Sequence, residues 1–262
     1  MSAGRESAVR IGLLYPELLG TYGDSGNATV LAQRLRRRGI GADVVSVESR
    51  EPVPAGCDVY LLGGAEDAAQ RHVARALAEG GVFAGVVDRG AAVLAVCAGL
   101  QVLGESFEVS DGTTMSGAAV LDLRTRRPVD PRRTPRAVGE AVVQPRADLG
   151  LPVVVGFENH GGLTSLGPSA QPLGTALAGI GNGGEPGGSE GIATGRILGT
   201  YLHGPVLALN PALADLLLSY VVGSLEPIDD SAAERARAHR LAMAAGHSRR
   251  RRFSRFSRSA AR

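Results

Sequence analysis

Lysine is absent from the sequence, so all 28 basic side chains among its 262 residues are arginines. Schiff-base chemistry needs a lysine amine, and the phosphate-binding loop G-x-x-x-x-G-K-[ST] needs a lysine to reach the phosphates. Both are therefore excluded. If a reaction of this protein consumes ATP, we expect another polypeptide to bind the nucleotide.

Cysteines and long apolar runs are also scarce. Two cysteines, Cys57 and Cys97, cannot build a disulfide framework, and no His or Cys cluster has metal-ligand spacing. No apolar segment approaches the roughly 18–20 residues that span a bilayer, and MSAGRESAVR at the N-terminus lacks the apolar core of a signal peptide. With 44% hydrophobic residues, the sequence predicts a soluble globular protein of the cytoplasm.

Acidic residues are missing from one end of the chain, because residues 247–262 hold seven arginines and no acid. Subtracting seven from the formal net charge of +2 leaves −5 for the rest. We expect this basic tail to be disordered. Phe253 and Phe256 among the arginines are compatible with weak contact to anionic phospholipid. A solvated tail without a role is the favoured alternative, and no nucleic-acid partner is expected.

Apolar runs alternate with amphipathic segments in the first hundred residues. Strands are predicted at Val9–Tyr15, Ala42–Val47, Asp58–Leu62 and Ala92–Val96, and helices at Ser25–Arg38, Glu66–Ala78 and Val82–Arg89. This alternation predicts an α/β fold of flavodoxin-like type, with a mostly parallel central sheet flanked by helices. In such folds reactive groups lie at the carboxyl ends of the strands.

The second half of the chain is less regular. Further strands are predicted at Ala118–Leu123, Ala137–Val143, Pro152–Glu158 and Gly191–Leu202, and helices at Asn210–Val222 and Ser231–Gly246. The proline-rich stretch 124–136 and the glycine-rich stretch 179–191 are expected to be loops, the latter flexible and on the surface. The expected organisation is an N-terminal extension (1–8), one domain (9–224), a helical extension (225–246) and the basic tail (247–262).

Cys97 lies in A-V-L-A-V-C-A-G-L-Q-V-L-G, between an apolar strand and a helix-like segment. Small neighbours there permit the sharp strand-turn-helix of a nucleophile elbow, at which a helix N-terminus favours a thiolate. A packed core cysteine fits the same spacing. Cys57 follows a Pro-Ala-Gly turn without a glycine behind it, and we expect it to be a structural thiol.

A thiol nucleophile needs a base, and five histidines are available. His203, in G-T-Y-L-H-G-P, ends the last predicted strand and is the better partner for a cysteine at a strand end. His160, in F-E-N-H-G-G, is a second candidate or a hydrogen-bonded loop residue. His72, His239 and His247 lie in polar helical or tail segments and are expected to be solvated.

Several motifs together carry a resemblance to a known family. V-C-A-G-L-Q-x-L-G, the Gly63-Gly64 turn and Y-L-H-G-P resemble class I (triad-type) glutamine amidotransferases, to about Val222. L-Y-P-E-L-L-G-T-Y-G-D-S-G-N, L-G-G-A-E-D, R-A-V-G-E-A-V-V and G-F-E-N-H-G-G-L-T are similar to the cobyric-acid-synthase-like branch. Within that branch, the similarity is strongest to the glutaminase subunits of lipid II isoglutaminyl synthases.

The resemblance implies a role for each matching residue. Cys97 would attack the side-chain amide of glutamine, with His203 moving the proton. The backbone N–H groups of Gly64 and Ala98 would hold the oxyanion, and Gln101 would contact the substrate. Arg136 matches the arginine that holds the glutamine carboxylate. Arg132 and Arg133 are the alternatives, because the preceding loop is longer here.

Two positions depart from the family pattern. Ala95 stands where many relatives have glycine, and Pro205 replaces the glutamate that usually orients the histidine. Another acid is then required, and Asp24 in Y-G-D-S-G-N is the candidate that matches the branch. An ordinary helix cap is the equal alternative for Asp24. Glu158 and Asn159 are further candidates as residues of the site wall.

The implied function is that of a glutaminase subunit in a heterodimer. It would pass ammonia to a Mur-ligase-like, ATP-dependent partner that amidates the D-glutamate of lipid II in peptidoglycan synthesis. ATP and Mg²⁺ are expected in the partner, and no cofactor or metal in this subunit. The alternatives are an amidotransferase for a corrinoid or another small acid, and a non-catalytic regulatory relative.

Overall fold

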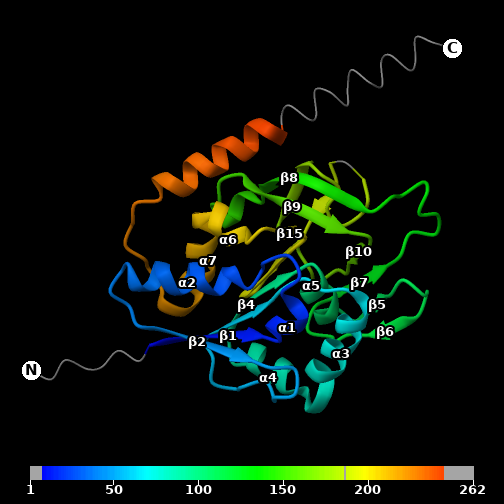
Figure 1. The fold of residues 1–262 in the computed structure, drawn as a ribbon, viewed down its shortest axis with the longest axis horizontal. Helices are drawn as coiled ribbons and strands as arrows, with labels where there is room; N and C mark the ends of the chain where they lie inside the picture. The colour runs from blue at the N-terminus through cyan, green and yellow to red at the C-terminus, as the bar shows by residue number, and fades with distance from the viewer. Residues whose placement is uncertain (1–7, 186, 245–262) are drawn as a thin grey trace, which may run out of the picture.

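The computed structural model describes residues 8–185 and 187–244, and a six-stranded sheet lies at its centre (Figure 1). In spatial order the strands are β13 (Ile192–Thr194), β14 (Ile197–Thr200), β4 (Ala92–Val96), β3 (Val59–Leu62), β1 (Val9–Leu14) and β2 (Ala42–Val47). All neighbours pair in parallel except β13 with β14. Strands β3 and β4 are buried at every position, as expected for a sheet covered on both faces.

Two groups of helices flank this sheet (Figure 1). The helices are α1 (Pro16–Leu19), α2 (Gly26–Arg36), α3 (Asp67–Ala78), α4 (Val82–Asp88), α5 (Ala98–Leu103), α6 (Val206–Leu209) and α7 (Pro211–Val222). Helices α2, α6 and α7 contact one another, and α3 contacts α1, α4 and α5. The predicted α/β fold with a mostly parallel sheet is confirmed.

Two smaller sheets complete the fold. One has the order β10 (Leu163–Leu166), β7 (Leu123–Arg126), β5 (Ser106–Glu108), β6 (Thr114–Ser116). The other has the order β12 (Ser189–Glu190), β11 (Gly174–Ala178), β8 (Ala137–Pro145), β9 (Val154–His160), β15 (Leu202–His203). Because β14 belongs to the central sheet and β15 to this second one, the chain changes sheets at Tyr201.

Two expectations for the middle of the chain are wrong. Residues 118–122 form no strand, and β7 begins only at Leu123 and enters the expected proline-rich loop. Leu123 and Thr125 are buried in alternation, and the prolines begin only at Pro128. The stretch 179–191 is also more than a surface loop, because it contains β12 and buries Asn182.

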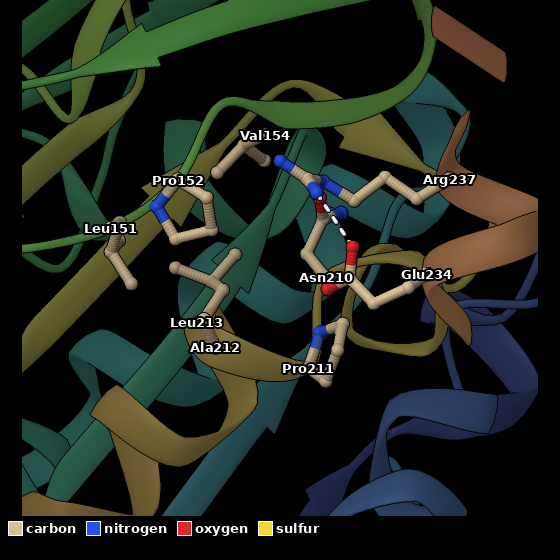
Figure 2. Close-up of a pocket in the computed structure, with 9 residues that line it drawn as sticks. All are labelled: Leu151, Pro152, Val154, Asn210, Pro211, Ala212, Leu213, Glu234 and Arg237. Atoms are coloured by element: carbon tan, nitrogen blue, oxygen red, sulfur yellow. Dashed lines mark hydrogen bonds and ion pairs between the residues drawn. The ribbon is translucent and has the colours of Figure 1, made fainter. Parts of the chain in front are cut away.

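Residues after α7 fold back onto the domain. Arg34 of α2 forms ion pairs with Asp215 of α7 at 2.7 Å and with Asp230 at 2.6 Å. Residues 231–244 are helical and cross over β8 and β9 (Figure 1). Figure 2 shows Arg237 of this helix reaching back to the domain, where its guanidinium donates to the Val153 carbonyl.

The cavity under this helix has a volume of about 10 Å³, and none of the expected site residues lines it (Figure 2). Such a volume holds about one water molecule. The expected basic tail (247–262) and most of the expected N-terminal extension lie outside the residues that the structure describes. Among residues 8–185 and 187–244, no helix is long and apolar enough to cross a membrane.

Candidate active site

Cys97 sits in the sharp turn between β4 and α5, with φ 52° and ψ −106°. A non-glycine residue in that conformation is strained, which is typical of functional turns. The turn is held from two sides, because the Cys97 N–H donates to the Thr200 carbonyl at 2.8 Å and the Gly99 N–H donates to Gly63 at 3.1 Å. A side chain at position 99 would meet Leu62 at 2.7 Å, so glycine is required there.

His203 reaches this turn from β15, and the imidazole is buried. Burial disfavours the imidazolium, but the hydrogen bond to Asp24 and the interaction with Cys97 outweigh burial and raise the pKa of His203 to about 9. Nδ1 donates to Asp24, and Nε2 has no hydrogen-bond partner among the described residues. Nε2 is therefore the ring nitrogen available to take a thiol proton.

Asp24 is the carboxylate that bonds to the His203 imidazole, the contact that the family pattern assigns to a glutamate. Its Oδ2 accepts from His203 Nδ1 at 2.8 Å and from the Gly64 N–H at 2.9 Å, and the side chain is buried. The alternative role as a side-chain helix cap is wrong, since α2 has no side-chain cap. Cys97, His203 and Asp24 thus form a chain of thiol, imidazole and carboxylate, the arrangement of a catalytic triad.

The D-S-G-N motif explains how proline is accommodated at position 205. A side chain at Gly26 would meet the Pro205 ring at 2.5 Å, so the start of α2 packs directly on this proline. Asn27 accepts a hydrogen bond from the Leu207 N–H at 3.0 Å. The motif therefore docks onto the H-G-P segment and brings Asp24 to the histidine.

Two expected substrate contacts are not supported by the geometry. The Gly64 N–H, expected to hold the oxyanion, is used by Asp24 instead. Gln101 is buried, where its Oε1 accepts from Gln70 at 2.6 Å and its Nε2 donates to the Tyr201 hydroxyl at 3.1 Å. Both ends of the Gln101 amide are thus satisfied within the protein. The Ala98 N–H, at the first position of α5, donates to no described residue, and its role as a donor to the oxyanion stays a prediction.

Arg136 lies at the rim of the site. Its guanidinium donates to the Asn159 side chain at 2.6 Å and to the Tyr22 hydroxyl at 3.3 Å. The Tyr22 ring lies against His203, with centroids 4.5 Å apart. Arg136 is thereby connected to His203 through the Tyr22 side chain, and Arg136 itself is exposed.

The alternatives to Arg136 lie elsewhere. Arg133 pairs with Asp130 at 3.7 Å, and the Arg132 N–H donates to the same carboxylate at 2.9 Å. Of the two site-wall candidates, Asn159 contacts Arg136, whereas Glu158 is buried and accepts from the Ile180 and Gly181 N–H groups.

The other described histidines and the second cysteine make no hydrogen bond to Cys97, His203 or Asp24. His160 is buried, stacks on Tyr201 at 4.0 Å and bonds to the Gly162 carbonyl. His72 and His239 are exposed, and His247 is outside the described residues. Cys57 is buried before β3, at the opposite end of the strands, and burial raises its pKa. Within the described ranges, no group of acidic, histidine and cysteine side chains could hold a metal ion.

Sequence reasoning missed three residues that shape the site: Tyr22, Thr200 and Glu190. Tyr22 could have been suspected because it lies two residues before Asp24. Thr200 and Glu190 carry no motif signal, and only tertiary packing shows that Glu190 accepts from Thr200 at 2.8 Å.

Comparisons with known proteins identify the family of the chain. A model described as the CobB/CobQ-like glutamine amidotransferase domain matches residues 10–211. Subunit GatD of the glutamine-hydrolysing lipid II isoglutaminyl synthase of Staphylococcus aureus is 35% identical over 202 residues, covering 76% of this chain and 79% of that protein. GatD of Streptococcus pneumoniae is 31% identical over 214 residues, covering 80% and 79%. A glutamine amidotransferase structure from Thermotoga maritima shares the fold at 17% identity, with a TM-score of 0.52 and coverage of 88% and 93%. The chain therefore belongs to the CobB/CobQ-like glutamine amidotransferase family.

Proposed function

We propose that this protein is the glutamine-hydrolysing subunit of a lipid II isoglutaminyl synthase, with Cys97, His203 and Asp24 as its catalytic triad. The observation that carries the catalytic part is the buried hydrogen bond of His203 to Asp24, together with the interaction with Cys97 that helps to raise the pKa of His203. The substrate assignment rests on the similarity to two GatD subunits over about four fifths of their length.

The reaction follows from these positions. His203 Nε2 takes the Cys97 proton, and Sγ forms a bond to the amide carbon of glutamine while the carbonyl oxygen becomes negative. The C–N bond then breaks, and the imidazolium returns its proton to the leaving nitrogen, which departs as ammonia. Water attacks the thioester with His203 as base, releasing glutamate and the thiol.

The other half of the reaction belongs to a partner. Activation of a carboxylate for amidation consumes ATP, and this chain lacks the lysine that phosphate-binding loops use. The partner we propose is MurT, the Mur-ligase-like subunit, which would bind ATP and Mg²⁺ and the lipid II acceptor in the cytoplasm. This subunit would need no cofactor of its own.

Reconstitution with the Mur-ligase-like subunit tests the proposal. We expect a stable complex on gel filtration, and amidation of lipid II that requires both ATP and glutamine. The Cys97→Ala complex should amidate with ammonium chloride but not with glutamine. Amidation of a corrinoid acid instead of lipid II would favour the corrinoid alternative. Equal, negligible glutamate release by wild type and Cys97→Ala within the complex would indicate a non-catalytic relative.

Substitution of Arg136 by glutamine should weaken glutamine binding. Loss of a charge-assisted carboxylate contact predicts a rise of roughly 10- to 100-fold in the KM for glutamine, with a much smaller change in kcat. Steady-state glutamate release measures both constants. Arg133→Gln is the matched control, since that side chain is exposed and pairs only with Asp130. An unchanged KM in Arg136→Gln would remove Arg136 from the substrate site.

A further inference from the structure

Glu190 is a carboxylate buried at the centre of the molecule, with 1% of its surface exposed. It ends β12 and immediately precedes the β13–β14 hairpin. Oε1 accepts from the Tyr201 N–H at 2.7 Å and from the Thr200 hydroxyl at 2.8 Å. Oε2 has no hydrogen-bond partner among the described residues. Both bonds go to the segment that leads into His203.

Thr200 connects that carboxylate to both halves of the reactive pair. Its backbone carbonyl accepts from the Cys97 N–H at 2.8 Å. Its hydroxyl donates to Glu190 and accepts from the Leu202 N–H at 3.0 Å, one residue before His203. Thr200 therefore bonds to the turn at Cys97 through its main-chain carbonyl and to the strand of His203 through its side-chain hydroxyl.

The need for these contacts follows from the path of the chain. Thr200 ends β14, which pairs with β4, while Leu202 and His203 pair with β9 in a different sheet. Where a chain passes from one sheet to another, its backbone N–H groups lose the hydrogen bonds of the first sheet. The N–H groups of Tyr201 and Leu202 are buried, so they need other acceptors. Glu190 and the Thr200 hydroxyl supply them.

The position of Glu190 is itself fixed. Asn182, which is fully buried, exchanges two 2.9 Å hydrogen bonds with the main chain of Gly191. Glu158 is the other buried carboxylate nearby, and it is held by the Ile180 and Gly181 N–H groups. Burial, and then the charge of Glu158, raise the pKa of Glu190 to about 7. The two hydrogen bonds from Tyr201 and Thr200 offset part of the cost of burying this carboxyl group.

We propose that Glu190 is a positioning residue which, through Thr200, sets the placement of His203 relative to Cys97. This inference rests on the proposed function only in taking Cys97 and His203 as the reacting pair. Glu190 touches neither substrate nor thiol. It fixes the sheet-crossing segment, so that the imidazole stays in contact with both the thiol and Asp24.

Four variants of the full-length chain test this assignment. Thr200→Val keeps the shape and the carbonyl to Cys97 but removes the hydroxyl, whereas Thr200→Ser keeps the hydroxyl. Glu190→Ala removes the acceptor, whereas Glu190→Gln keeps an acceptor oxygen without the charge. Ser219→Ala is the control, because the Ser219 hydroxyl bonds within α7, to the Leu216 carbonyl at 2.7 Å.

Two measurements are made on each variant. The first is kcat and KM for glutamate release, in complex with the Mur-ligase-like subunit. The second is the rate of iodoacetamide alkylation at the Cys97 peptide as a function of pH, with His203→Ala as reference. The second needs neither glutamine nor partner, so it judges the placement of His203 even if the proposed function fails.

We expect Thr200→Val and Glu190→Ala to lower kcat by roughly 10- to 100-fold with KM within about twofold, because misplacement of a reacting group affects the chemical step. Their alkylation profiles should shift toward that of His203→Ala. Thr200→Ser, Glu190→Gln and Ser219→Ala should retain the wild-type profile. Wild-type alkylation profiles in both Thr200→Val and Glu190→Ala, even with lowered melting temperatures, would overturn the proposal, since the role would then be structural only.

Discussion

The Asp24→Asn variant should hydrolyse glutamine roughly 10²- to 10⁴-fold more slowly than wild type, the range for loss of an oriented acid-base group. One oxygen, Oδ2, accepts both from His203 and from Gly64. An asparagine with its oxygen in that place loses the charge that stabilises the imidazolium. If the side-chain amide of the asparagine is rotated by 180°, its NH₂ group faces the protonated Nδ1 of His203, and two donors then oppose each other. Either arrangement impairs proton transfer, while the KM for glutamine should change little.

The same variant makes a prediction about stability and pH. The pKa of His203 is raised from 6.5 to about 9 in the folded protein, so the proton binds more tightly to the native state. The stabilisation from protonated His203 is complete below pH 6.5 and is lost as the pH rises through about 9. The difference in free energy of unfolding between wild type and Asp24→Asn should therefore be largest below pH 6.5, shrink between pH 6.5 and about 9, and be lost at higher pH.

Glutamate release and urea denaturation from about pH 6 to about pH 10 measure these two effects. Asp122→Asn is the control, because Asp122 is a surface carboxylate whose hydrogen bonds go to Ser169. Wild-type kcat in Asp24→Asn would show that Asp24 does not orient His203 and that another acid does.

Substitution of Gly64 by alanine should lower kcat by roughly 10²-fold, the order expected for a displaced catalytic group. A Cβ at this position would lie 2.6 Å from His203 Cε1 and 3.3 Å from Asp24 Oδ2. The imidazole is buried and held by Asp24, so it cannot move aside without breaking that bond. The added methyl group would therefore separate the base from the thiol.

The matched control is Gly183→Ala, where an added Cβ has no neighbour within 4 Å and the backbone needs no positive φ. Its kcat should equal that of wild type. Circular dichroism and melting temperature on both variants separate a local displacement from unfolding. If Gly64→Ala kept wild-type kcat, His203 would not need the position that the structure gives it.

Much of the fold follows from local sequence signals. The runs at Val9–Tyr15, Asp58–Leu62 and Ala92–Val96 are apolar and β-branched, and each forms a strand of the parallel sheet. The short strands β5, β6, β10 and β11 were not predicted. They have three to five residues each of mixed polarity, and their pairing depends on contacts distant in sequence.

The site shows the same division between local and distant signals. Cys97 and His203 follow apolar strands, so their placement at strand ends could be predicted. The pairing of Asp24 with His203 spans 179 residues, and the sequence alone left a helix cap equally open. Gly64 and Gln101 were expected to contact the substrate, because a sequence motif places them near the nucleophile but does not show where their hydrogen bonds go. In the structure, both residues form hydrogen bonds with other residues of the protein instead.

Covalent capture by a glutamine analogue tests the central claim most directly. A diazoketone analogue of glutamine reacts at a thiol that is activated and placed beside the bound amino acid. Intact mass and peptide mapping of the wild-type complex should show one adduct, on Cys97, suppressed by excess glutamine and strongly slowed in Asp24→Asn and His203→Ala. An adduct on Cys57 instead, or labelling of Cys97 at equal rates in all three proteins, would contradict a Cys97–His203–Asp24 catalytic triad.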